Sequence, residues 1–170
     1  MAKLNGIEVP GLYTTENDND PIVKIHFTNP NGRGDWFVTE GQLESNGDWY
    51  FFGFVRSPLQ PEFDELGYFT LSELQNAGIV KDTEWDSKPL SEAKDEALAI
   101  EALEAILYDL FGVKNFFIHQ LCVGAKNIVK IGGVENLDTH IHGTHEDKVL
   151  WIEKVGLVRL FDLTEQILVQ

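Results

Sequence analysis

The chain has 170 residues, of which 43% are hydrophobic, and this composition is typical of one globular domain or of two small units that share an interface. Its 28 acidic and 13 basic residues give a formal charge of −15 at pH 7. This charge argues against direct binding of nucleic acid, because neutralisation of phosphates is the main source of such affinity. It is compatible with a soluble surface, or with electrostatic steering towards a basic partner such as the nucleic-acid channel of another protein.

A single cysteine, Cys122, excludes an intrachain disulfide and favours a reducing compartment, so we expect the protein in the cytoplasm. Its apolar sequence context indicates a buried structural thiol rather than a nucleophile. The first residues lack the apolar core of a signal peptide, and no apolar run approaches the roughly 20 residues of a membrane span. We therefore expect neither export nor membrane insertion.

The first half of the chain alternates in polarity and predicts a small antiparallel sheet. After an irregular start, Ile22–Thr28 is predicted as a strand whose Val23, Ile25 and Phe27 face the core. Three further segments are predicted as strands: Asp35–Gln42, Asp48–Val55 and Leu66–Thr70. Asn46-Gly47 is a hairpin signal between the first two of these. The aromatic density from Trp49 to Phe54 predicts that Trp49 and Phe51 or Phe52 lie in the core.

Helix signals follow the sheet. Thr70 and Glu73 have the spacing of a capping box, and Gly78 ends the short helix that this box predicts. Ser91 opens the clearest helix, Glu92–Phe111, whose Ile100, Leu103, Leu107 and Leu110 share one face and which Gly112 ends.

The apolar run Phe116–Ile131 is compatible with a buried helix or with a pair of strands. Strands are favoured there, and one or two further strands are predicted over Val149–Leu163, after a polar loop or hairpin at Leu137–Lys148. These elements predict an α+β fold, an antiparallel sheet with one long and one short helix packed against it. An aromatic-rich sheet domain is expected over residues 1–91, and residues 92–170 are either an added element or a continuation of the same domain.

Five segments of the first half carry a resemblance to a known family: Leu12–Glu16, Asp35–Glu40, Phe51–Val55, Leu66–Leu74 and Lys88–Glu92. In order and spacing they resemble the domain of unknown function 2958 family, small proteins of plasmids and phages that are often encoded near antirestriction genes. The resemblance covers about residues 12–92. It implies a mobile element in a bacterial host cell as the setting, and it implies no reaction and no catalytic residue.

Three of the five histidines lie in one short segment and are the best metal candidates of the sequence. His140 and His142 form an H-x-H pair that would point both rings to one side of a strand, and His145 or Glu146 could complete the site. No residue in the sequence is evident as the supporting partner that orients such ligands, so we predict no metal and no cofactor here.

Acidic residues in two segments are candidates for contact with a partner: Glu62, Asp64 and Glu65 in a proline-bounded loop, and Glu146 and Asp147 after the histidines. The loop carboxylates could also serve acid–base chemistry or bind a cation, but a solvated loop is the simpler interpretation. No phosphate-binding glycine loop, nucleophile elbow or zinc-protease motif is present in the sequence.

The hypothesis that best accommodates these patterns is a non-enzymatic acidic protein of a phage or plasmid, acting in the host cytoplasm. It would bind a host protein with a basic nucleic-acid-binding surface and so interfere with a defence complex of the restriction or CRISPR type, as a nucleic-acid mimic. One alternative is a metal-dependent hydrolase or nuclease centred on His140, His142 and His145. Another is a structural or assembly protein of the phage particle.

Overall fold

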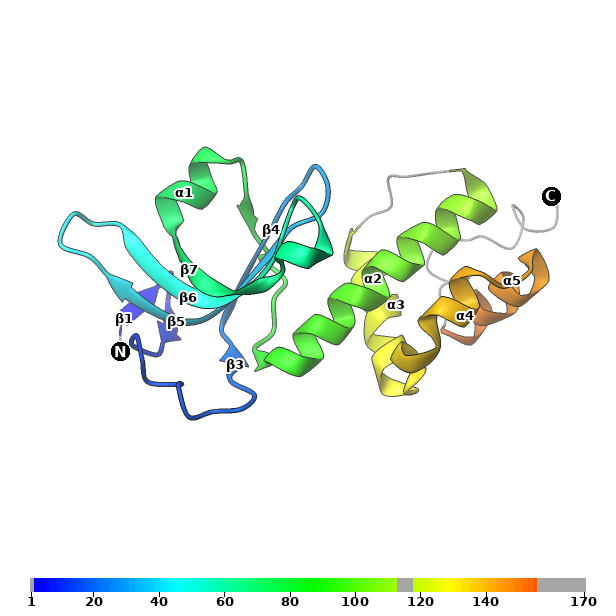
Figure 1. Ribbon diagram of the computed structural model, residues 1–170, viewed down its shortest axis with the longest axis horizontal. Helices are drawn as coiled ribbons and strands as arrows, with labels where there is room; N and C mark the ends of the chain where they lie inside the picture. The colour runs from blue at the N-terminus through cyan, green and yellow to red at the C-terminus, as the bar shows by residue number, and fades with distance from the viewer. Residues whose placement is uncertain (1, 113–117, 156–170) are drawn as a thin grey trace. The chain divides into compact units, whose positions relative to one another are not determined.

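The computed structural model describes residues 2–112 and 118–155, without the side chains of residues 111 and 118–122 (Figure 1). The chain divides into two units, Met1–Ala93 and Lys94–Gln170, which are described separately. The first is built on a sheet, and the described part of the second is helical. The expected α+β class is therefore confirmed.

A five-stranded antiparallel sheet forms the centre of the first unit, with the strand order β7-β6-β5-β4-β8 (Figure 1). Its strands are β4 (Ile25–Thr28), β5 (Asp35–Leu43), β6 (Trp49–Arg56), β7 (Glu65–Thr70) and β8 (Val80–Lys81). Two short pairs flank it: β1 (Ala2–Leu4) with β2 (Ile7–Val9), and β3 (Ile22–Val23) with β9 (Lys88–Pro89). The predicted strands of the first half are confirmed, except that the first is divided at Lys24 into β3 and β4.

One face of the sheet carries the core of the first unit. Ile25 and Phe27 are buried on it, as the alternation predicted, and so are Trp49 and Phe51. Val23, in β3, is also fully buried. The rest of this core comes from neighbouring strands, from the start of the chain and from the helical segment after β7: Val9, Trp36, Val38, Phe69, Leu74 and Ile79.

Gly53 of β6 lies opposite Val38 of β5 at a point where the two backbones come close. A Cβ atom at residue 53 would lie 1.8 Å from the carbonyl oxygen of Phe37, so a larger residue cannot occupy this position without moving a strand.

Helix α1 (Leu71–Asn76) follows β7 directly and contacts β6 and β7 (Figure 1). The Thr70 side chain accepts a hydrogen bond from the Glu73 amide, and the Glu73 side chain accepts one from the Thr70 amide. The predicted capping box is therefore confirmed. After the helix, Gly78 adopts a φ of 75°, which glycine reaches without a steric penalty. A single 3₁₀ turn, η1 (Pro61–Phe63), lies in the loop between β6 and β7.

The second unit is built from helices around a core of its own. Its elements are α2 (Leu90–Phe111), which begins within the first unit, α3 (Ile118–Lys130), η2 (Gly133–Asn136), α4 (Leu137–Ile141) and α5 (His145–Lys154). Leu103, Leu107 and Leu110 of α2 are buried against Ile128 of α3 and Trp151 of α5. Lys148 of α5 donates a 2.5 Å hydrogen bond to Asp109 of α2, which lowers the pKa of that carboxyl.

The prediction of strands over Phe116–Ile131 and Val149–Leu163 is wrong wherever the structure describes these segments. Residues 118–130 form α3, and residues 149–154 belong to α5. The polar loop expected over Leu137–Lys148 is also helical for most of its length, because α4 and the first turn of α5 occupy it. The long helix Glu92–Phe111 is confirmed as α2, and Gly112 follows it with a φ of 67°.

The buried strand β6 gives the first testable prediction. Phe51→Ala should lower the free energy of unfolding by about 3 to 5 kcal/mol, because it removes a fully buried ring from the centre of the core. Leu43→Ala, at an exposed position of β5, is the control and should change stability by no more than about 0.5 kcal/mol. Urea unfolding followed by tryptophan fluorescence measures both. Equal effects of the two substitutions would contradict the assignment of the core face.

Candidate functional site

The face of the central sheet opposite the core carries polar and aromatic side chains in four rows. Residues paired across antiparallel strands point to the same side, so the register places each row directly. The rows are Thr28, Asp35 and Arg56; His26, Phe37, Phe54 and Leu66; Glu40, Phe52 and Tyr68; and Gln42, Tyr50 and Thr70. We call this side of the sheet the second face.

His26 is the centre of a buried charged network at one end of the second face. Its Nε2 lies 2.6 Å from Oδ1 of Asp35, and its Nδ1 lies 2.9 Å from Oδ2 of Asp82. Arg56 donates a 2.6 Å hydrogen bond to the other oxygen of Asp35. The side chains of His26, Asp35 and Arg56 are mostly buried, so these charges depend on one another for solvation.

Geometry decides the protonation state of His26. Both carboxylates can only accept hydrogen bonds when ionised, so both ring nitrogens must donate, and the ring is an imidazolium. Burial lowers the pKa of His26, but the hydrogen bonds and charges of Asp35 and Asp82 outweigh it and raise that pKa. Burial raises the pKa values of Asp35 and Asp82 in turn, while the hydrogen bond and charge of His26 bring both below their usual range. Two carboxylates, one imidazolium and one guanidinium give a neutral cluster.

Aromatic rings enclose the network. His26 stacks on Phe37 with a centroid distance of 4.9 Å, and Trp85 lies against both rings. The Trp85 indole donates a 3.1 Å hydrogen bond to the Val23 carbonyl, and Lys88 sits 4.4 Å from the centre of the indole ring. Both nitrogens of His26 are engaged by carboxylates from β5 and from the residue after β8, so the cluster joins these segments as a structural clamp.

The other end of the second face carries a set of four rings, two of them exposed and two half-buried. We call Tyr13, Tyr50, Phe52 and Tyr68 the aromatic surface. Tyr50 stacks on Tyr68 at 5.2 Å with 7° between the rings, and Phe52 meets Tyr68 at 4.9 Å. A hydrogen bond with the Tyr13 side chain raises the pKa of Tyr68. Tyr13 is 61% exposed and Tyr68 45% exposed.

Glu40 fixes Tyr13 at the edge of this surface. Glu40 is 2% exposed, and its carboxylate accepts three hydrogen bonds from the segment before β3: from the Tyr13 amide at 2.8 Å, from the Thr15 amide at 2.9 Å and from the Thr15 hydroxyl at 2.5 Å. Tyr13 has a φ of 69°, a left-handed conformation that is rare for a bulky residue. Such strain persists only where the surroundings impose it, and here the Glu40 carboxylate does so.

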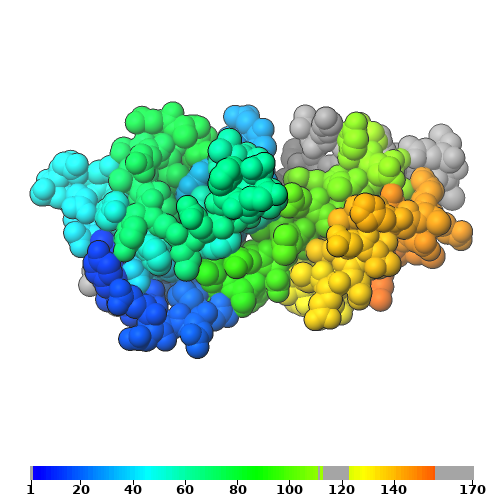
Figure 2. All heavy atoms as spheres, in the orientation of Figure 1, coloured from blue at the N-terminus to red at the C-terminus, as the bar shows by residue number. Residues whose placement is uncertain are grey.

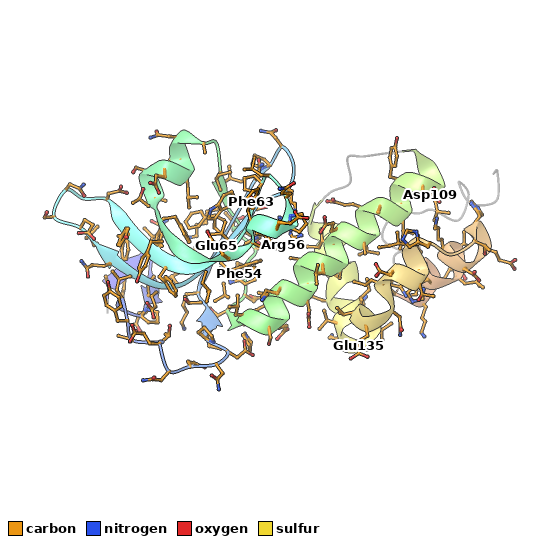
Figure 3. The ribbon with its side chains drawn as sticks, in the orientation of Figure 1. Phe54, Arg56, Phe63, Glu65, Asp109 and Glu135 are labelled. Atoms are coloured by element: carbon orange, nitrogen blue, oxygen red, sulfur yellow. The ribbon has the colours of Figure 1, made fainter. Side chains whose placement is uncertain are left out.

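The acidic candidates of the β6–β7 loop differ in what they contact. Asp64 accepts two hydrogen bonds from Arg33, at 2.8 and 2.7 Å, and one from the Ser57 amide. The hydrogen bonds from Arg33 are the main cause of a lowered pKa of Asp64. Glu62 and Glu65 are exposed, and Figure 3 shows Glu65 near Phe54, Arg56 and Phe63, where β6 ends and β7 begins. The segment around η1 lies at the surface of the first unit (Figure 2).

The structure places the three candidate histidines on helical segments, so the predicted H-x-H strand geometry is wrong. His140 lies in α4 and stacks on Trp151 at 4.5 Å, His142 follows that helix and His145 begins α5. Burial, and then the charge of Lys154, lowers the pKa of His140. Within the side chains that the structure describes, no group of three or more His, Cys, Asp and Glu is arranged to hold a metal ion.

The two acidic residues after the histidines lie in the first turn of α5. Glu146 is exposed there, and Asp147 completes a capping box with Thr144. Sequence reasoning missed this box, although Thr144 and Asp147 have its spacing. The side chain of Cys122, expected to be buried, lies outside the described residues.

Sequence reasoning also missed the His26 network and Glu40. The chain offers one signal for each: a charged residue that alternates with buried apolar neighbours within a predicted strand.

Over residues 2–112 and 118–155, no helix has the length and apolar character needed to cross a membrane. Comparison of the chain with family models, curated proteins and solved structures found no match. The resemblance to the domain of unknown function 2958 family therefore stays a prediction.

The His26 network predicts a pH dependence of stability. A raised pKa means that the contribution of His26 is complete below its unfolded pKa of about 6.5 and is lost as pH rises through the folded value. The lowered pKa values of Asp35 and Asp82 make their contribution complete above about 4, and it is lost in stronger acid. The free energy of unfolding should therefore fall between pH 6 and pH 9. Urea unfolding at both pH values measures this fall.

The fall should disappear in His26→Gln and persist in His142→Gln, which changes an exposed histidine. An NMR titration of the folded protein provides a direct measurement of the same quantity. A His26 ring that titrates below 6.5 would contradict the network as described.

Glu40 gives a prediction about local order. Glu40→Ala removes the acceptor of the Tyr13 and Thr15 amides, so hydrogen exchange at both should accelerate by on the order of tenfold or more. The Lys24 amide, which donates to the Val38 carbonyl, is the internal reference and should keep its protection. Unchanged exchange at Tyr13 and Thr15 would show that Glu40 does not hold this segment.

Proposed function

We propose that the chain is a non-enzymatic binding protein that docks its acidic surface on the basic, nucleic-acid-binding surface of another protein. The observation that carries the proposal is the distribution of charge. Residues 1–93 contain sixteen Asp and Glu against six Lys and Arg, a formal charge of −10 out of −15 for the whole chain. A field of this strength accelerates association with a basic partner and opposes association with nucleic acid.

Four of the six cations of the first unit are paired with a carboxylate or buried. Arg33 pairs with Asp64, Arg56 with Asp35 and Lys3 with Glu8, while Lys88 is buried beside Trp85. Many carboxylates are exposed instead: Glu8, Glu16, Asp18, Asp20, Glu62, Glu65, Glu73, Glu84, Asp86 and Glu92. The acidic character of the sequence is therefore also the character of the surface of this unit.

The setting comes from the resemblance to plasmid and phage proteins found near antirestriction genes. In that setting the partner is a host defence complex of the restriction or CRISPR type, and the acidic surface competes with nucleic acid for its channel. No observation in the described residues favours the hydrolase alternative, since the three histidines do not converge. The assembly-protein alternative predicts a partner without a nucleic-acid site, and the experiment below separates the two.

The test is capture from a nuclease-treated bacterial lysate on the immobilised full chain. The expected result is a basic nucleic-acid-binding protein that salt releases, because the contacts are ionic and are screened by salt. Duplex DNA should displace the captured protein, while the chain itself should show no binding to random duplex DNA at physiological salt. A captured protein that neither salt nor DNA displaces would contradict the proposal, as would micromolar binding of the chain to random duplex.

Charge variants make the test specific to the first unit. Glu62→Gln with Glu65→Gln removes two exposed charges of the β6–β7 loop and should weaken capture and the salt dependence of release. Glu135→Gln with Asp138→Asn removes two exposed charges of the second unit and is the matched control. Equal effects of the two pairs would show that net charge alone acts, without a surface on the first unit.

A further inference from the structure

We infer that the aromatic surface of Tyr13, Tyr50, Phe52 and Tyr68 is the centre of the docking site and receives an arginine side chain of the basic partner. The inference rests on the proposed function and adds to it a position on the sheet and a residue type. Three observations carry it: exposed rings in fixed geometry, a strained backbone that holds one of them, and the charge around them.

The first observation is the arrangement of the rings. Tyr68 is stacked with Tyr50 and tilted against Phe52, so three rings of β6 and β7 form one continuous π surface. Tyr13 and Tyr68 are both exposed, and so is Leu66 on the neighbouring row. Exposed apolar groups gathered at one place on an otherwise charged surface mark an interaction site. Tyrosine is enriched among the residues that dominate binding energy at interfaces.

The second observation is that Tyr13 is held in an unfavourable backbone conformation. Its φ of 69° is unfavourable for a bulky side chain, and a buried carboxylate, Glu40, fixes both its amide and that of Thr15. Glu40 shares a row with Phe52 and Tyr68, so the group that positions Tyr13 belongs to the same face. Residues held under strain by their surroundings cluster at binding sites, where a preset geometry lowers the entropy lost on binding.

The third observation is charge. The segment that carries Tyr13 also carries Glu16 and Asp18, both exposed, and no Lys or Arg lies in residues 10–23 or in β7; Lys24, which follows that segment, is half-buried. The one cation of β6 is Arg56, which is buried and paired with Asp35. The segments that carry these rings hold more carboxylates than cations, so the surface attracts a cation and repels a phosphate, and a nucleobase is disfavoured as the occupant. A second copy of this chain would bring a like charge and is disfavoured for the same reason.

Arginine fits this chemistry better than lysine. The planar guanidinium stacks on an aromatic face and still donates to neighbouring carboxylates, whereas an ammonium is a more strongly hydrated point charge. Proteins that bind nucleic acid carry arginine on the surface that contacts phosphate. An arginine of that surface is therefore the occupant that satisfies both the rings and the charge.

The experiment measures binding of two labelled peptides, nona-arginine and nona-lysine, to the full chain by fluorescence anisotropy. The arginine peptide should bind about two- to fivefold more tightly than the lysine peptide of equal charge, the range expected for an exposed cation–π contact. Tyr13→Ala with Tyr68→Ala should abolish this preference and leave the lysine peptide nearly unaffected. Tyr13→Phe with Tyr68→Phe keeps both rings and should keep the preference.

Tyr108→Ala is the matched control, because it removes a tyrosine of the second unit with a similar exposed fraction. Circular dichroism and the urea midpoint establish that each variant is folded, and sedimentation equilibrium gives its oligomeric state. If both peptides bind wild type equally, or if the alanine pair retains the preference, the aromatic surface is not the arginine site although the proposed function stands. If neither peptide binds, the proposed function fails with it. A wild-type dimer that the alanine pair dissociates would assign the surface to a second copy instead.

Discussion

The clamp at His26 is the interaction on which the first unit depends. The His26 imidazolium of β4 binds Asp35 of β5 and also Asp82, which follows β8. Asp35 in turn binds Arg56 of β6. Three strands of the sheet and the residue that follows a fourth are thereby joined by charges that cancel. Removing one partner would leave an uncompensated buried charge, which costs far more than the intact network contributes, so the cluster enforces one arrangement of these strands.

The two ends of the second face differ in how their carboxylates are used. At the His26 end, every carboxylate is matched by a cation and Trp85 closes the cluster, so no charge is offered to a partner. At the Tyr68 end, the carboxylate of Glu40 holds a backbone segment, and Tyr13 and Tyr68 beside it are exposed. A rigid, neutral end thus supports an exposed aromatic end on the same strands, and rigidity of this kind is what a binding surface needs to avoid an entropy cost.

The sheet was predictable because its signals are local. Alternation in Ile22–Thr28, the Asn46-Gly47 hairpin and the Thr70–Glu73 capping box each lie within a few residues, and the structure confirms them. The helices after Gly112 were missed for a physical reason. In α3, Ile118, Leu121, Ala125 and Ile128 are spaced three and four apart, as on a helix face, but the β-branched and aromatic residues nearby favoured strands.

The candidate site was less predictable than the sheet because its contacts are long-range. Asp82 meets His26 from 56 residues away, and Glu40 meets Tyr13 from 27 residues away. A charged residue within a strand pattern shows only that a partner is needed, because any of the many opposite charges in the chain could supply it. The strand register identifies the neighbours of such a residue, since it places Glu40, Phe52 and Tyr68 in one row. The same row brings the buried carboxylate of Glu40 beside Tyr68, so a residue that reads as an isolated charge in the sequence belongs to the aromatic end of the second face.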